Sequence, residues 1–110
     1  MVGRLRTLSR RNWTYMLKIR VDNQPEIIIL YVEGKLVGDS VDELRRVWTT
    51  LRSESPTIPT TVELSSVRVV DVTGRKLLTQ MHEWGSELSG SGLVIGSLIN
   101  EIRSARNQSV

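Results

Sequence analysis

The fold is decided by residues 62–74, which read VELSSVRVVDVTG. Its apolar residues first alternate with polar ones and then continue with Val67, Val69 and Val70, which predicts a strand on a buried path that ends at Asp71. The next residues, Asp71-Val72-Thr73-Gly74, are typical of a strand-to-helix junction, where Asp71 or Thr73 caps the helix and Gly74 eases the turn. A strand that leads directly into a helix favours an α/β fold.

Downstream of this junction, helical and strand patterns alternate. A helix ending near Gly90 is predicted by apolar residues at helical spacing, namely Leu77, Leu78, Met81, Trp84 or Gly85, and Leu88. The short apolar run 93–95 is bounded by glycines, which predicts a central parallel strand. Ser97 is then expected to cap a last helix, whose inner face holds Leu98, Ile99 and Ile102.

Upstream of the junction, the pattern predicts a hairpin followed by a helix. Residues 15–21 alternate as in a half-solvated strand, and the β-branched run 27–32 predicts a second strand buried on both faces. Ser40 and Glu43 fit a capping box before a helix that ends at Ser55-Pro56. Its inner face comprises Val41, Leu44, Val47, Trp48 and Leu51.

The complete order, β-β-α-β-α-β-α, predicts an α/β fold with a mixed four- to five-stranded sheet. The sheet combines the N-terminal antiparallel hairpin with parallel strands, and three to four helices cover it.

Length and charge predict one domain preceded by a basic arm. The chain has 110 residues, with 15 Lys and Arg against 12 Asp and Glu. Four of the basic residues, Arg4, Arg6, Arg10 and Arg11, precede every acidic one, so the rest of the chain carries 11 basic and 12 acidic residues. We therefore expect a disordered arm over residues 1–12 and a single domain over 13–110. The arm is the basis of one hypothesis, weak attachment to nucleic acid or another anionic surface.

Few residues could support catalysis or bind a metal. The chain has no cysteine, and His82, its one histidine, falls at the border of an apolar helix face, as a rim residue would. Gly90-Ser91-Gly92 is expected to precede a strand, the wrong order for a phosphate-binding loop. Asp71 lacks the paired carboxylates that a Mg²⁺-dependent phosphoacceptor needs. We expect no enzymatic activity, no metal and no cofactor.

The apolar runs are short. The longest, residues 27–32, has six residues, far below the roughly 20 that span a bilayer. We therefore expect no membrane span and a cytoplasmic protein.

Four segments of the chain, taken in order, resemble a STAS domain, the fold of anti-sigma factor antagonists. They are EGKLVG at 33–38, VDEL at 41–44, VELSSVRVVDVTG at 62–74 and Leu77-Leu78. The resemblance extends from about Met16 to Ile102. It implies a four- or five-stranded mixed sheet flanked by helices, in agreement with the order derived above.

The resemblance also implies a site. In that family the loop usually reads Asp-Ser-Ser-Gly, and the hydroxyl residue before the glycine is phosphorylated by a partner kinase that is also an anti-sigma factor. Thr73 stands at that position, with Asp71 and Gly74 at the acidic and glycine positions. The chain departs from the pattern at Val72, which replaces the first serine, and at Val37, which replaces an aspartate.

The implied partner is a protein, a serine kinase of the anti-sigma type or another signalling protein. It would dock on the loop and the helix start, Asp71, Val72, Thr73, Gly74, Arg75 and Lys76, and on an adjacent surface formed by Val37, Gly38 and Asp39. Arg75 and Lys76 would either hold a phosphate on Thr73 or meet an acidic partner. An alternative from the same family is an accessory STAS subunit of a membrane transporter, with no phosphate involved.

Overall fold

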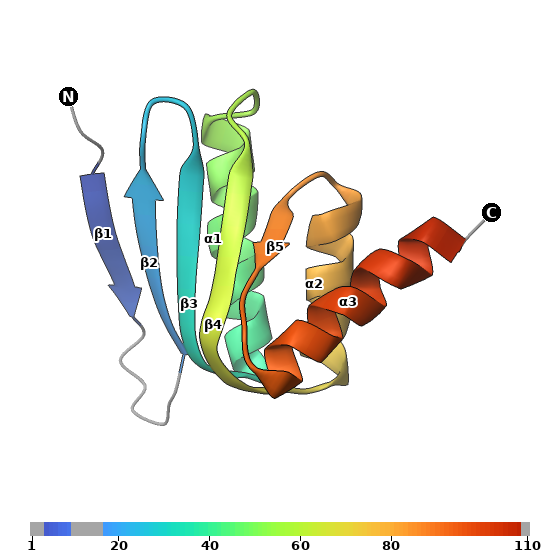
Figure 1. The fold of residues 1–110 in the computed structure, drawn as a ribbon. Helices are drawn as coiled ribbons and strands as arrows, with labels where there is room; N and C mark the ends of the chain where they lie inside the picture. Colours follow the sequence, from blue (N-terminus) through green and yellow to red (C-terminus); the bar gives the residue numbers. More distant parts are fainter. Residues whose placement is uncertain (1–3, 10–16, 109–110) are drawn as a thin grey trace.

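The computed structural model describes residues 4–9 and 17–108, which form one sheet covered by helices (Figure 1). Among these residues the sheet has five strands in the spatial order β1-β2-β3-β4-β5. The strands and helices follow along the chain as β1 (Arg4–Ser9), β2 (Leu17–Asn23), β3 (Ile28–Leu36), α1 (Asp39–Glu54), β4 (Thr60–Val70), α2 (Val72–Glu83), β5 (Glu87–Ser89) and α3 (Leu93–Gln108). The pairs β1–β2 and β2–β3 are antiparallel, whereas β3–β4 and β4–β5 are parallel. The predicted α/β class and mixed sheet are confirmed.

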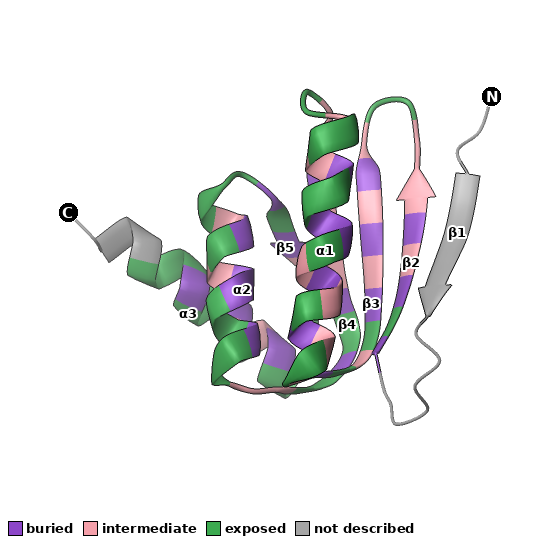
Figure 2. Ribbon diagram, turned by 180° about the vertical axis from the view of Figure 1, so that it is seen from behind, coloured by how far each residue is buried: buried purple, intermediate pink, exposed green. Residues whose placement is uncertain are grey.

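The helices α1 and α2 lie on the same side of the sheet, behind it in Figure 1 and in front of it in Figure 2. Alternate residues of β2 and β3 point toward them and are buried, namely Leu17, Ile19, Val21, Ile28, Leu30 and Val32. The residues between, such as Ile29 and Tyr31, are only partly buried. The expectation that residues 27–32 are buried on both faces is therefore wrong, because α1 and α2 cover the same face.

The predicted inner faces of the first two helices are confirmed in large part. In α1 the five expected residues are all buried, and the helix ends at Glu54 with Ser55 as its C-cap residue. In α2 the buried side chains are Leu77, Leu78 and Met81, which pack in one core with Leu44 and Leu64. That helix ends at Glu83, however, and Leu88 belongs to β5, so the predicted cap at Gly90 is wrong. Gly85, with φ of 99°, follows the helix in the left-handed region that suits glycine.

The capping box expected at Ser40 and Glu43 is also wrong. Gly38 is the N-cap residue of α1, and no side chain there accepts a cap hydrogen bond. The Ser40 hydroxyl instead accepts a hydrogen bond from the Val37 N–H at 2.9 Å and lies 2.7 Å from the Lys35 carbonyl oxygen. Ser40 therefore ties the helix start to the end of β3.

The largest correction concerns residues 93–95, which are the first turn of α3 and not a central strand. The parallel strand is Glu87–Ser89, where Leu88 pairs with Val62. Because α2 ends early, the chain reaches the sheet sooner than the pattern predicts. Ser97 lies inside α3 and does not cap it, although Ile99 and Ile102 are buried and Leu98 is partly buried, as expected.

Gly90 has a packing role. A Cβ on it would lie 2.7 Å from Cγ2 of Ile95, so Gly90 allows α3 to approach the sheet closely.

The disordered arm expected over residues 1–12 is replaced, over Arg4–Ser9, by strand β1. This strand pairs antiparallel with the whole of β2, from Arg4 opposite Asn23 to Ser9 opposite Lys18. Pairing of this kind uses backbone N–H and C=O groups, which any sequence other than proline provides. The basic charge of residues 1–12 and their lack of a hydrophobic period therefore give no sign of this strand. Residues 1–3 and 10–12 of the expected arm, and Tyr15 of the expected first strand, lie outside the described residues.

A tryptophan cluster joins α1 to the turn that follows α2. The rings of Trp48 and Trp84 meet edge to face, with centroids 6.3 Å apart, and the Arg52 guanidinium lies about 5 Å from both rings. The Trp48 indole N–H donates to Ser86 Oγ at 3.0 Å in a buried hydrogen bond. This cluster determines where β5 begins relative to α1.

Candidate functional site

Asp71 organises the junction between β4 and α2. It is the N-cap residue of α2, and its Oδ1 accepts a hydrogen bond from the Gly74 N–H at 2.8 Å. Its Oδ2 accepts a second from the Gly38 N–H at 3.0 Å. These bonds, that of Gly74 first, lower the pKa of the Asp71 carboxyl from its usual value of 3.8, because both stabilise the charged form. The sequence predicts a cap by either Asp71 or Thr73, and in the structure the cap is Asp71.

Gly74 allows the start of α2 to approach the end of β3. A Cβ on Gly74 would lie only 2.5 Å from the carbonyl oxygen of Leu36. The φ angle of Gly74 is not positive, so turn geometry does not require glycine at this position. Glycine is required because the two segments pack so closely. In addition, the Asp71 N–H donates to the same Leu36 oxygen at 3.2 Å.

The expected adjacent surface lies next to the loop. Gly38, with φ of 55°, is in the left-handed region, and its N–H points at Asp71. Asp39 beside it is exposed, and Val37 is partly buried. One carboxylate thus links two segments that are 33 residues apart in sequence.

The two residues between Asp71 and Gly74 face outward. Val72 is 69% exposed, which is unusual for a valine, and Thr73 is exposed as the second residue of α2. A hydroxyl at this position lies at the positive end of the helix dipole and is accessible to a second protein. Because Asp71 and Gly74 fix the backbone on both sides, the loop presents Val72 and Thr73 in a defined orientation.

The two basic residues expected near Thr73 have different surroundings. Arg75 forms an ion pair with Glu101 of α3, with Nη1 and Oε1 2.8 Å apart. Lys76 is exposed and forms no ion pair with any of the described residues. It lies three residues after Thr73 on α2, so the two side chains are neighbours on the helix surface.

Sequence reasoning missed the exposed apolar residues at this end of the sheet. Val69, the second-last residue of β4, is 43% exposed, so the expected buried path does not continue through it. Leu93 and Val94, which begin α3, are 85% and 64% exposed. We refer to these three residues and Val72 together as the apolar rim. The apolar run 93–95 carries this signal, but its pattern predicts a buried strand. Only Ile95 of that run is buried.

Gly90-Ser91-Gly92 follows a strand, β5, and precedes a helix, α3. The expectation that this segment precedes a strand, which argued against a phosphate-binding loop, is therefore wrong. The Ser91 N–H donates to Ser65 Oγ on β4 at 3.2 Å. This bond fixes the loop to the sheet.

Other features bear on enzyme and membrane hypotheses. His82 is partly buried on α2, as the sequence predicted. Across residues 4–9 and 17–108, no group of three or more His, Asp and Glu side chains is arranged to hold a metal ion. In the same part of the chain, no helix is both long enough and apolar enough to cross a bilayer.

A scan of protein-family models finds none that matches the chain, and a search of curated proteins also finds no match.

Proposed function

We propose that the protein is a regulatory protein-interaction module, similar to an anti-sigma factor antagonist, that binds its partner through residues 71–76 and the apolar rim. The observation that supports this proposal is the exposure of Val72 and Thr73 on a junction held by two Asp71 hydrogen bonds. Exposed apolar side chains on an ordered junction are typical of a docking surface. A role in signalling or transcription places the protein in the cytoplasm.

The surroundings of Thr73 suit it to act as a switch. A phosphate on Thr73 adds about −1.5 to −2 charges at the helix start, next to the apolar Val72. The helix dipole and the neighbouring Lys76 stabilise this charge within the protein. A partner that covers Val72 would have to desolvate the phosphate, which is unfavourable. Phosphorylation of Thr73 therefore releases the partner. Arg75 has a lesser role in this switch than the sequence suggested, because it pairs with Glu101.

The first experiment identifies the partner by contact. A photo-cross-linking amino acid at position 72 is expected to capture a partner in cells, and the same residue at Thr49, exposed on α1, is the control. Calorimetry with the purified partner then compares the wild type with Val72→Asp and Thr73→Asp. Both variants are expected to weaken binding at least roughly tenfold, because each places a charge in the contact. Thr49→Asp should bind as the wild type does. Equal binding by all four proteins would disprove docking at this site.

A second experiment separates the phosphate switch from docking that needs no phosphate. The protein is incubated with ATP and the captured partner, or with its associated kinase, and intact mass is measured. A gain of one phosphate that disappears in Thr73→Val supports the switch. If the mass does not increase but binding still depends on Val72, the docking surface is supported without the phosphate switch. This outcome favours the accessory subunit.

A further inference from the structure

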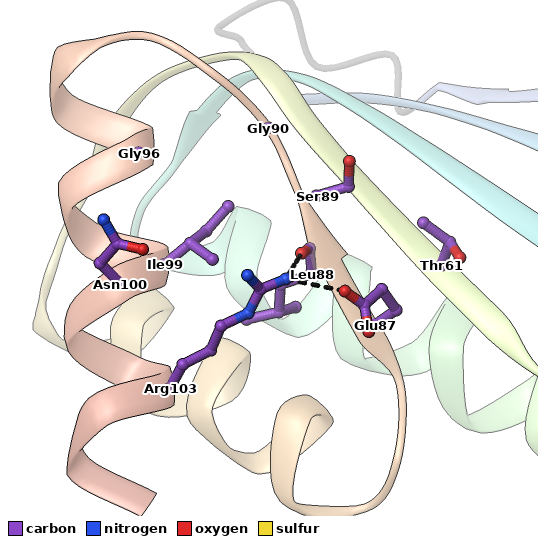
Figure 3. A pocket seen from close by; sticks show the side chains of 9 residues that line it. All are labelled: Thr61, Glu87, Leu88, Ser89, Gly90, Gly96, Ile99, Asn100 and Arg103. Atoms are coloured by element: carbon purple, nitrogen blue, oxygen red, sulfur yellow. Dashed lines mark hydrogen bonds and ion pairs between the residues drawn. The ribbon is translucent and has the colours of Figure 1, made fainter. Parts of the chain in front are cut away.

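A cleft of about 480 Å³ lies between β5 and α3, and the core residues Leu88 and Ile99 contribute to its lining (Figure 3). Strands β4 and β5 contribute Thr61, Glu87 and Ser89, which share the sheet face opposite the buried Val62 and Leu88. Helix α3 contributes Gly96, Asn100 and Arg103, which share one helix face because they are spaced by four and three residues. The cleft has the volume of a small-molecule site.

The two charges of the cleft neutralise each other. Arg103 Nη2 donates to Glu87 Oε2 at 2.7 Å and to the Leu88 carbonyl oxygen at 3.0 Å, and Figure 3 shows its side chain reaching from α3 to β5. The guanidinium keeps further N–H donors, and the carboxylate keeps a second oxygen as acceptor. A ligand with a net charge of either sign would meet one repelling group, so the cleft suits an uncharged ligand.

The other polar side chains of the cleft have hydrogen-bonding capacity to spare. Within the part of the chain that the structure describes, the side chains of Thr61, Ser89 and Asn100 make no hydrogen bond. Two hydroxyls and one carboxamide both donate and accept. A compound with several hydroxyl groups matches such a mixed set, since each of its groups also donates and accepts.

Gly96 points independently to an occupant. It lies in α3, where glycine destabilises a helix relative to alanine. Its φ is not positive, and a Cβ built on it would meet no atom of the described residues within 4 Å. Neither backbone geometry nor packing within the described chain requires glycine. The missing side chain instead widens the cleft at its α3 wall.

We propose that this cleft binds an uncharged small molecule with several hydroxyl groups, of about monosaccharide size. The ligand lies between the polar face of β4–β5 and the 96–103 face of α3. It exchanges hydrogen bonds with Thr61, Ser89 and Asn100, and with the groups that the Arg103–Glu87 pair leaves unused. The proposal does not depend on docking at residues 71–76, because none of those residues lines the cleft.

The test is an NMR titration of the full chain, labelled with ¹⁵N, with related probes. D-Glucose and D-ribose are the uncharged probes, while D-glucuronate and D-glucosamine add a negative and a positive charge. Saturable shifts at the amides of Ser89, Gly90, Gly96 and Asn100 are expected with an uncharged probe in the millimolar range. The charged probes should bind at least roughly tenfold more weakly. If neither uncharged probe shifts these amides, or if a charged probe binds equally well, the proposal is wrong.

Two variants test the contribution of the cleft itself. Gly96→Leu fills the cleft and improves helix propensity, so it should abolish the shifts without lowering the melting temperature. The control Ser97→Leu adds similar bulk at an exposed residue outside the cleft and should bind normally. Glu87→Gln leaves the Arg103 charge uncompensated, which should reverse the preference toward D-glucuronate. Unchanged binding by Gly96→Leu, or an unchanged preference in Glu87→Gln, would overturn the proposal.

Discussion

Asp71 at the end of β4 accepts a hydrogen bond from the Gly38 N–H at 3.0 Å, and so connects the start of α2 to the turn before α1. Both parallel crossovers of the sheet therefore meet at one carboxylate. The candidate docking residues Val72 and Thr73 follow this carboxylate directly. Changes in its charge should affect both the fold and the site.

The first prediction concerns the pH dependence of stability at Asp71. Its pKa is lowered in the folded protein, so the carboxylate stabilises the fold above the usual value of 3.8, and this contribution is lost as pH falls through the lower folded pKa. Asp71→Asn removes the charge at every pH. Urea unfolding should show that the wild type is more stable than the variant at pH 7, with a smaller difference near pH 3. A difference that does not change with pH would contradict this role.

The second prediction separates two glycines that both lie in helices. Gly74→Ala should lower the free energy of unfolding by about 1–3 kcal/mol, because its Cβ would meet the Leu36 carbonyl oxygen at 2.5 Å. Gly96→Ala is the matched control, because its Cβ would meet no described atom within 4 Å. It should raise the free energy of unfolding by about 0.5–1 kcal/mol through helix propensity. Denaturant unfolding at neutral pH measures both. Equal changes in the free energy of unfolding at the two positions would show that α2 does not pack closely against the end of β3 at Gly74.

The third prediction tests the hydrogen bond between Trp48 and Ser86. Ser86→Ala leaves the indole N–H without its buried partner, so the free energy of unfolding should fall by about 1–3 kcal/mol. Ser97→Ala, at an exposed position of α3, should change it by less than about 0.5 kcal/mol. Urea titrations followed by tryptophan fluorescence provide the measurement. A Ser86→Ala protein as stable as the wild type would argue against this contact.

The fourth prediction tests whether residues 93–95 begin a helix. Leu93 is 85% exposed, whereas Ile95 is 3% exposed. Leu93→Ala should therefore change the free energy of unfolding by less than about 0.5 kcal/mol, and Ile95→Ala should lower it by about 2–4 kcal/mol. In a central strand buried on both faces, both substitutions would be costly. A large loss from Leu93→Ala would favour the strand and remove Leu93 from the apolar rim.

The sequence by itself determined the elements whose burial follows a regular period. The inner face of α1, the strand ending at Val70 and the helix start at Asp71 were all predicted. In each case a residue's neighbours in sequence report its environment, because one face of a helix or strand packs on the core. Asp71 was also recognised as a possible cap, since capping depends on residues within one helical turn.

Only the tertiary structure decided the features that depend on distant partners. A short apolar run such as 93–95 has no period, so its identity as helix or strand depends on where α2 ends and β5 pairs. The pairing of β1 with β2, the contact of Gly38 with Asp71 and the close approach at Gly74 join residues far apart in the chain. The exposure of Val72 beside Thr73, and the cleft opened by Gly96, follow from the same packing and leave no local pattern in the sequence.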